Sequence, residues 1–152
     1  MSFDVQVQAF IEVLIAVMLG GVVGLEREFA NKPARLRTHM LVAGASALFV
    51  VLGDIIVLHF ESSIPGNASM ADPVRIIQAI VVGISFLGAG TIIRLDREER
   101  VEGLTTAASI LFMSAIGITV ALDLVYLAIG VTLLVLIINR ALGVFSKIWI
   151  KR

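Results

Sequence analysis

Five long apolar runs constrain this chain more than any other feature of its sequence. They cover about residues 5–25, 38–60, 74–93, 104–122 and 124–138. A helix needs about 20 apolar residues to cross the hydrocarbon core of a bilayer. The chain is 59% apolar and 16% charged, whereas soluble domains are about 25% charged. We therefore predict an all-α membrane protein in which residues 1–152 form one domain, a bundle of five transmembrane helices.

The distribution of lysine and arginine between the connecting segments predicts the orientation of this bundle. The turn after the first run holds four of these residues, the turn after the third run three, and the segment after the fifth run four. The opposite side holds only Arg75. Cytoplasmic loops carry the excess of basic residues. We expect a multi-pass protein with the N-terminus outside and both charged turns and the C-terminus in the cytoplasm.

Several classes of function are disfavoured by composition. The chain has no cysteine, which rules out disulfides, thiolate zinc sites and cysteine nucleophiles. Its net charge is zero and its basic residues are grouped by loop, so we do not expect nucleic acid as a partner. We find no catalytic triad order and no zinc-ligand spacing, and we interpret His39 and His59 as structural. We therefore predict no enzyme activity, no catalytic residues and no cofactor.

Charged residues gather where the first apolar run ends and the second begins. Glu26 and Arg27 close the first run, and Arg37 and Thr38 open the second. One interpretation is an interfacial ion-pair cluster that fixes the helix ends. The other is that Glu26 is held partly desolvated among Arg27, Arg37 and Arg94, where it forms a gate or a contact surface. Placing a charge within a membrane costs free energy, and such charges often have a function.

Two carboxylates fall within the apolar runs. Glu12 lies about 12 Å deep at about 1.5 Å per residue, and Asp54 lies at a similar level on the second run. Together with Gln78 on the third run, they form a hypothetical set of oxygen ligands for Mg²⁺. The alternative is that both carboxyl groups are protonated or reach toward the interface.

Small residues recur at spacings that let membrane helices approach closely. They occur at Gly20 and Gly24, over 43–47 and over 83–90. Packing within the chain is one explanation, and association into a homo-oligomer, most simply a dimer, is another. Apart from the lipid bilayer, we therefore expect a second copy as a partner.

The two charged turns also suggest an internal repeat. Four residues in the first half are followed 68 positions later by the same or a similar residue: Gly20 and Gly88, Glu28 and Asp96, Leu36 and Leu104, Thr38 and Thr106. Our hypothesis is that the first two helices and the next two are parallel repeats, related by a pseudo-two-fold axis along the membrane normal.

Four ordered sequence blocks resemble the MgtC/SapB (YhiD-related) family of bacterial inner-membrane proteins. The blocks are Gly-Gly-Val-Val-Gly-Leu-Glu-Arg-Glu at 20–28, Leu-Arg-Thr at 36–38, Gly-x-x-Phe-Leu-Gly-Ala-Gly-Thr-Ile-Ile at 83–93 and Gly-Leu-Thr-Thr-Ala-Ala at 103–108. The resemblance implies that the family's motif positions here are Glu26, Arg27, Arg37, Thr38, Gly88, Gly90, Thr105 and Thr106. The chain departs from the family pattern at Arg35 and Glu102.

This resemblance implies a plasma-membrane protein of magnesium homeostasis that serves adaptation to low Mg²⁺, with a link to virulence in pathogens. Such a protein could act by modulating another membrane protein complex, or it could transport Mg²⁺ or another cation directly. Mg²⁺ would then be a ligand or a substrate. Many members continue into a soluble C-terminal domain, so we expect a short form that lacks this domain.

Overall fold

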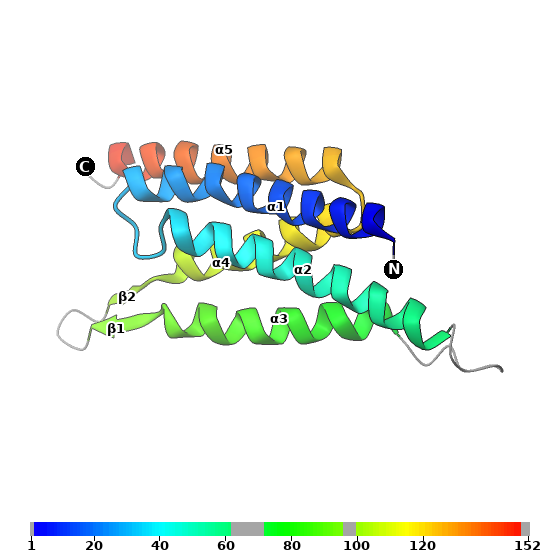
Figure 1. Ribbon diagram of the computed structural model, residues 1–152. Helices are drawn as coiled ribbons and strands as arrows, with labels where there is room; N and C mark the ends of the chain where they lie inside the picture. The colour runs from blue at the N-terminus through cyan, green and yellow to red at the C-terminus, as the bar shows by residue number, and fades with distance from the viewer. Residues whose placement is uncertain (1, 62–71, 96–99, 150–152) are drawn as a thin grey trace.

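The computed structural model describes residues 2–61, 72–95 and 100–149. Within these ranges the chain forms five α-helices and one pair of short strands (Figure 1). In chain order they are α1 (Phe3–Phe29), α2 (Leu36–Glu61), α3 (Pro73–Gly90), β1 (Ile93–Leu95), β2 (Arg100–Glu102), α4 (Leu104–Ala121) and α5 (Val125–Trp149). The all-helical bundle that we predicted is confirmed in its coarse form.

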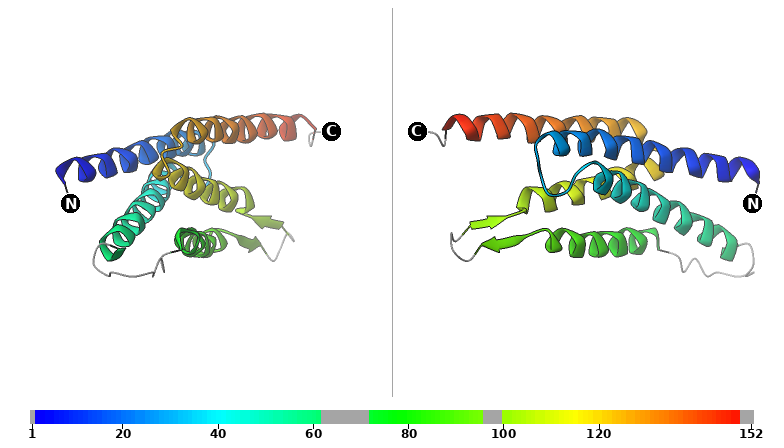
Figure 2. Two further views of the ribbon diagram at one scale, coloured as in Figure 1. Left: turned by 90° about the vertical axis from the view of Figure 1, so that its right-hand side faces the viewer. Right: turned by 60° about the vertical axis from the view of Figure 1, so that its left-hand side comes forward.

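The helices lie side by side, with α2 and α4 in the middle of the bundle. Helices α1 and α5 cover one side of this pair and α3 covers the other (Figures 1 and 2). The α1–α2 turn, the β1–β2 pair and the C-terminal end of α5 lie at one end of the bundle, and the N-terminal end of α1 lies at the other. We call the first of these the charged end. The arrangement agrees with the expected topology, in which these three segments share one side.

Among the residues that the structure describes, three helices are long and apolar enough to cross a membrane: Phe3–Phe29, Leu36–His59 and Leu104–Ala121. The apolar parts of the other two, Val74–Gly90 and Val125–Ala141, are shorter. Membrane crossing by all five helices therefore stays a prediction, as does the orientation of the termini.

Local sequence explains where several helices begin and end. The side chain of Asp72 accepts a hydrogen bond from the Val74 N–H at 3.0 Å, and Pro73 occupies the first helical position of α3. An Asp-Pro pair is a common start of a helix, because Asp caps the free N–H groups and proline fits the first helical position. The turns after α1 and α4 each contain a residue with positive φ, Asn31 at 52° and Asp123 at 59°. Asn and Asp tolerate this conformation better than most residues, so both turns can be tight.

Two helices have bounds that differ from those of the predicted spans. We expected the third span to reach residue 93 and a charged loop to follow, but α3 ends at Gly90 and an antiparallel pair of strands aligns Arg94 with Val101. We also expected the last helix to end near residue 138, but α5 continues to Trp149. No proline interrupts this part of the chain, so nothing in the backbone stops the helix there.

The main buried core lies between α1, α2, α4 and α5. It is built from small and branched side chains: Ala16, Val23, Ala43, Ala47, Ile110, Met113, Ile116, Val120, Ala128 and Val135. A separate, smaller cluster of Val50, Ile80 and Ile118 joins α3 to α2 and α4. Helix α3 is therefore attached to the bundle by less buried apolar surface than α1.

Contacts between the helices repeat at the spacing of 68 residues. A Cβ atom added to Gly20 would lie nearest to His39, and one added to Gly88 would lie nearest to Ala107, which is 68 residues beyond His39. The hydroxyl of Ser46 donates a hydrogen bond to that of Ser114, also 68 residues on, at 3.0 Å. A residue on a two-fold axis contacts its own counterpart, so this bond marks where such an axis would pass. These contacts support the hypothesis of parallel repeats.

Candidate functional site

Buried polar side chains converge at the charged end of the bundle, where α1 ends and α2 and α4 begin. The residues come from four helices: Glu26 and Arg27 from α1, His39 from α2, Ser109 from α4 and Asn139 from α5. Burying a polar group in an apolar bundle costs free energy unless the group has a hydrogen-bond or ion-pair partner. The partners of these side chains therefore indicate whether the cluster is structural or chemically active.

Glu26 and Arg27 form an ion pair that is almost closed to solvent. Arg27 Nε lies 3.2 Å from Glu26 Oε2, and the two side chains are only 4% and 13% exposed. The geometry is that of a charge contact, because Arg27 Nε makes no hydrogen bond. The Asn139 side-chain amide donates to the same Glu26 oxygen at 3.4 Å. Glu26 thus offsets the buried charge of Arg27 and joins the middle of α5 to the end of α1.

His39 is fully buried and is bound at both ring nitrogens. Nδ1 lies 2.9 Å from the Arg35 carbonyl oxygen, and Nε2 lies 3.2 Å from the Ser109 hydroxyl. A carbonyl oxygen can only accept, so Nδ1 carries a hydrogen and donates it. In a neutral ring Nε2 then accepts from Ser109, whereas in a charged ring it donates to Ser109. In the second case the hydroxyl turns to the Thr106 carbonyl, which lies 2.9 Å away.

This Ser–His pair has the spacing of a nucleophile and its base, but its setting differs from that of a catalytic site. Ser109 is 4% exposed and His39 is completely buried. The group that orients the imidazole is the backbone carbonyl of Arg35, immediately before the helix that carries His39, where a catalytic triad has a carboxylate. The pair locks α2 to α4, in agreement with our structural interpretation of His39.

The glycines near this end admit close contacts between backbones. A Cβ atom on Gly24 would lie 2.7 Å from Leu36 Cα, closer than real Cβ atoms approach other atoms. Gly103 has φ of 90° and faces the Thr91 carbonyl, so a side chain there would be strained and would clash. Gly88 is buried against Ala107, and a Cβ on Gly90 would meet nothing within 4 Å. Packing within the chain thus requires glycine at Gly24 and Gly103, whereas Gly88 and Gly90 have room for a Cβ atom.

The predicted arginine cluster around Glu26 is only partly assembled. Arg27 is in contact, but Arg37 and Thr38 are exposed in the first turn of α2. Among the described residues, no ion pair joins Arg37 to Glu26. Arg94 lies in β1, and the position of its side chain is outside what the structure describes. Of the paired threonines that open α4, Thr106 is buried and Thr105 is exposed.

The proposed magnesium ligands lie on three different helices, α1, α2 and α3. Glu12 is half-buried and accepts a hydrogen bond at 3.2 Å from Gln8, one turn earlier on α1. Asp54 and Gln78 are exposed on their helices. Across the described ranges, no three His, Cys, Asp or Glu side chains are placed to hold a metal ion together. A ligand set built on Glu12, Asp54 and Gln78 stays a prediction.

Sequence reasoning missed the residues that complete the buried network. We placed Asn139 in the segment after the fifth apolar run, yet its side chain donates a hydrogen bond to Glu26, 113 positions earlier in the sequence. Ser109 and Ser114 were not singled out, and Ser46 was included only as one of the small residues over 43–47. Their residue type could have indicated these contacts, because serine side chains in an apolar helix commonly form hydrogen bonds with a neighbouring helix.

Comparison with known proteins finds related sequences. The model of the MgtC family matches residues 13–148. The chain is 37% identical over 110 residues to YhiD of Escherichia coli K12, a proposed magnesium transporter, and 42% identical over 103 residues to MgtC of Brucella abortus. It is 32% identical over 118 residues to SapB of Bacillus subtilis.

These matches cover 72%, 68% and 78% of this chain. They cover 49%, 38% and 49% of YhiD, MgtC and SapB respectively, so the chain spans half or less of each relative's length. No solved structure matches the chain.

Proposed function

The chain belongs to the MgtC family, and from that premise we propose that it serves magnesium homeostasis in a bacterial plasma membrane by modulating another membrane protein. The proposal includes adaptation to low Mg²⁺ and, in a pathogen, a contribution to virulence. It is supported by the relatives' names and by one feature of the charged end.

The feature is the basic turn at residues 35–37. Buried contacts fix its backbone, and its charged side chains are exposed. Arg35 and Arg37 are exposed on either side of Leu36, and within the described part of the chain neither forms an ion pair. The Arg35 carbonyl accepts from the His39 ring, and Leu36 packs directly on Gly24. A surface fixed in advance loses less conformational entropy on binding, and unpaired charges at its rim steer an oppositely charged partner.

The partner that fits this surface is a membrane protein with acidic residues at the same face of the bilayer. Arg35→Gln with Arg37→Gln removes both charges without touching the buried network. In cells that depend on this protein for growth at limiting Mg²⁺, we expect the double variant to reach normal membrane levels and to fail in growth. Lys32→Gln is the matched control, since it removes one exposed charge from the same turn outside the pair.

Direct transport of Mg²⁺ or another cation is the second candidate function, favoured by Glu12. This acid is half-buried within a helix long enough to span a membrane, and it accepts a hydrogen bond from the neutral Gln8. Ionisable groups at such depth commonly mark an ion path.

Mg²⁺ flux into proteoliposomes that contain only the purified protein separates the two functions. Under the modulator proposal no flux above that of empty vesicles appears, and Glu12→Gln retains growth at low Mg²⁺. Flux that Glu12→Gln abolishes would establish the transporter and overturn the modulator proposal.

A further inference from the structure

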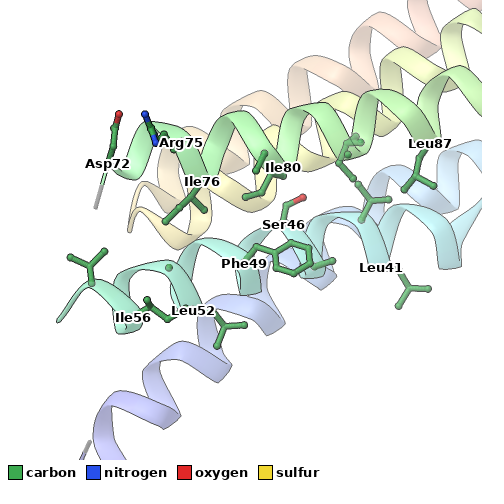
Figure 3. A pocket seen from close by; sticks show the side chains of 17 residues that line it. Leu41, Ser46, Phe49, Leu52, Ile56, Asp72, Arg75, Ile76, Ile80 and Leu87 are labelled. Carbon is green, nitrogen blue, oxygen red and sulfur yellow. The ribbon is translucent and has the colours of Figure 1, made fainter. Parts of the chain in front are cut away.

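An apolar groove runs between α2 and α3 on the side of the bundle away from α5. Its volume is about 1030 Å³. Figure 3 shows Asp72 and Arg75 at one end of it, Leu41 and Leu87 toward the other, and Ser46 with Ile80 between them. An α-helix is about 10 Å across, so this volume corresponds to roughly 13 Å of helix length.

The internal repeat identifies what fills the corresponding groove in the other half of the molecule. Shifting residue numbers by 68 carries α1 onto α3 and α2 onto α4, as the contacts of Gly20 and Gly88 do. The surface between α1 and α4 is therefore the counterpart of the surface between α3 and α2. Helix α5 lies on the α1–α4 surface, with Ala128, Thr132 and Val135 buried there. Figure 2 shows α5 beside α1 and α4, and α3 with α2 on the opposite side.

We propose that the groove between α2 and α3 receives one transmembrane helix, α3 of a second copy of this chain. This proposal does not depend on the proposed function. The direction of α5 supports it, because α5 runs parallel to α1 and antiparallel to α4. A helix in the counterpart groove must therefore run parallel to α3, as α3 of a second copy in the same bilayer does.

The wall formed by α3 has the side chains that such a contact requires. Ala79 and Gly83 both line the groove and lie four residues apart. A Cβ atom added to Gly83 would meet nothing within 4 Å, so the space above this glycine is unused within one chain. In contrast, Gly20 and Gly24 of α1 are already pressed against α2. Small residues four apart let two membrane helices pack closely, and a two-fold axis would fill both grooves at once.

The charges at the end of the groove also suit a parallel second copy. Asp72 and Arg75 lie at the same end of α3. In a parallel pair the same two residues of the second copy come to this level, so that each Arg75 finds a carboxylate near it. A lipid acyl chain would fill the groove as well, but it would gain nothing from small residues on the wall.

Disulfide crosslinking tests the contact directly, because the natural chain contains no cysteine. We expect Gly83→Cys to give a crosslinked dimer on oxidation in native membranes. Two controls are Val82→Cys, which is 70% exposed on the neighbouring face of α3, and Leu133→Cys, which is 55% exposed on α5. The yield from Gly83→Cys should exceed both by about tenfold, and equal yields from the three positions would overturn the proposal.

A second variant measures association without a crosslink. Gly83→Leu fills the groove and leaves the single chain intact, because the added atoms point into open space. Fluorescence energy transfer between labelled copies in vesicles, diluted with lipid, should show a dissociation constant raised about tenfold or more. Val82→Leu should leave it unchanged. A wild-type protein that is monomeric at every dilution, or a Gly83→Cys product whose mass shows a crosslink to a different protein, would refute the second copy as occupant.

Discussion

Replacing Gly20 by alanine tests how closely α1 and α2 are packed. The added Cβ atom would lie 2.6 Å from the His39 carbonyl oxygen and 2.9 Å from the Ala43 Cβ atom. An ordinary contact begins near 3.4 Å, so the two helices would have to separate by roughly 0.8 Å. Overpacking of this kind costs about 1–3 kcal/mol, against a gain of at most about 1 kcal/mol from replacing glycine in a helix. We expect a net loss of up to about 2 kcal/mol in unfolding free energy.

The internal repeat supplies a matched control for this substitution. At Gly88 the added Cβ would lie 3.6 Å from the Ala107 Cβ atom, which is an ordinary contact. Gly88→Ala should therefore be neutral or stabilising by up to about 1 kcal/mol. Unfolding of the purified protein in mixed micelles of increasing SDS content measures both variants against the natural chain.

The two substitutions have the same chemistry and occupy equivalent positions, so only the distance between the helices distinguishes them. If Gly20→Ala and Gly88→Ala shifted the unfolding midpoint equally, the close contact of α1 with α2 would not contribute to the unfolding free energy. A stabilised Gly20→Ala would show that the helices separate freely at this level. Either result would refute the reasoning from helix spacing.

Three further predictions concern the buried polar groups. Glu26→Ala leaves the Arg27 charge buried without its partner and should lower the unfolding free energy by about 3 kcal/mol, more than Arg27→Leu does, as SDS unfolding of both variants would show. A double-mutant cycle of Ser46→Ala and Ser114→Ala should give a coupling energy of about 0.6 kcal/mol, and additive effects would mean that the hydroxyls do not interact. Nitrogen NMR of the His39 ring should find the hydrogen of the neutral form on Nδ1, and a signal for the other tautomer would contradict the bond to the backbone carbonyl.

The parts of the fold that follow from local sequence were predictable, and the parts that depend on distant contacts were not. Apolar runs indicated the five helices, and the Asp-Pro pair gave the start of α3. The strands β1 and β2 contain three residues each, too few for an alternating pattern to stand out. The hydrogen bond from Asn139 to Glu26 joins residues 113 positions apart, and no local sequence pattern near either residue indicates this contact.

The candidate site was predicted in part for the same reason. The sequence places Glu26 and Arg27 next to each other, so their pairing needs only a shared helix end. An ion pair between Glu26 and Arg37 depends on which way the first turn of α2 faces. That direction is set by the burial of His39, whose bond to Ser109 spans 70 positions. With His39 turned inward, Arg37 remains exposed.

The two halves of the repeat differ at many positions, and the difference at the end of the first helix of each half offers an explanation of the strands. The counterpart of Gly24, 68 residues on, is Ile92. Gly24 lets the end of α1 lie against Leu36, whereas a branched side chain at residue 92 prevents the same approach of α3 to the start of α4. Helix α3 accordingly ends at Gly90, and the chain turns through β1 and β2 before α4 begins. The close backbone contact is made instead by Gly103, against the Thr91 carbonyl. This difference contributes to the looser packing of α3 compared with α1, beside a groove that a second helix can enter.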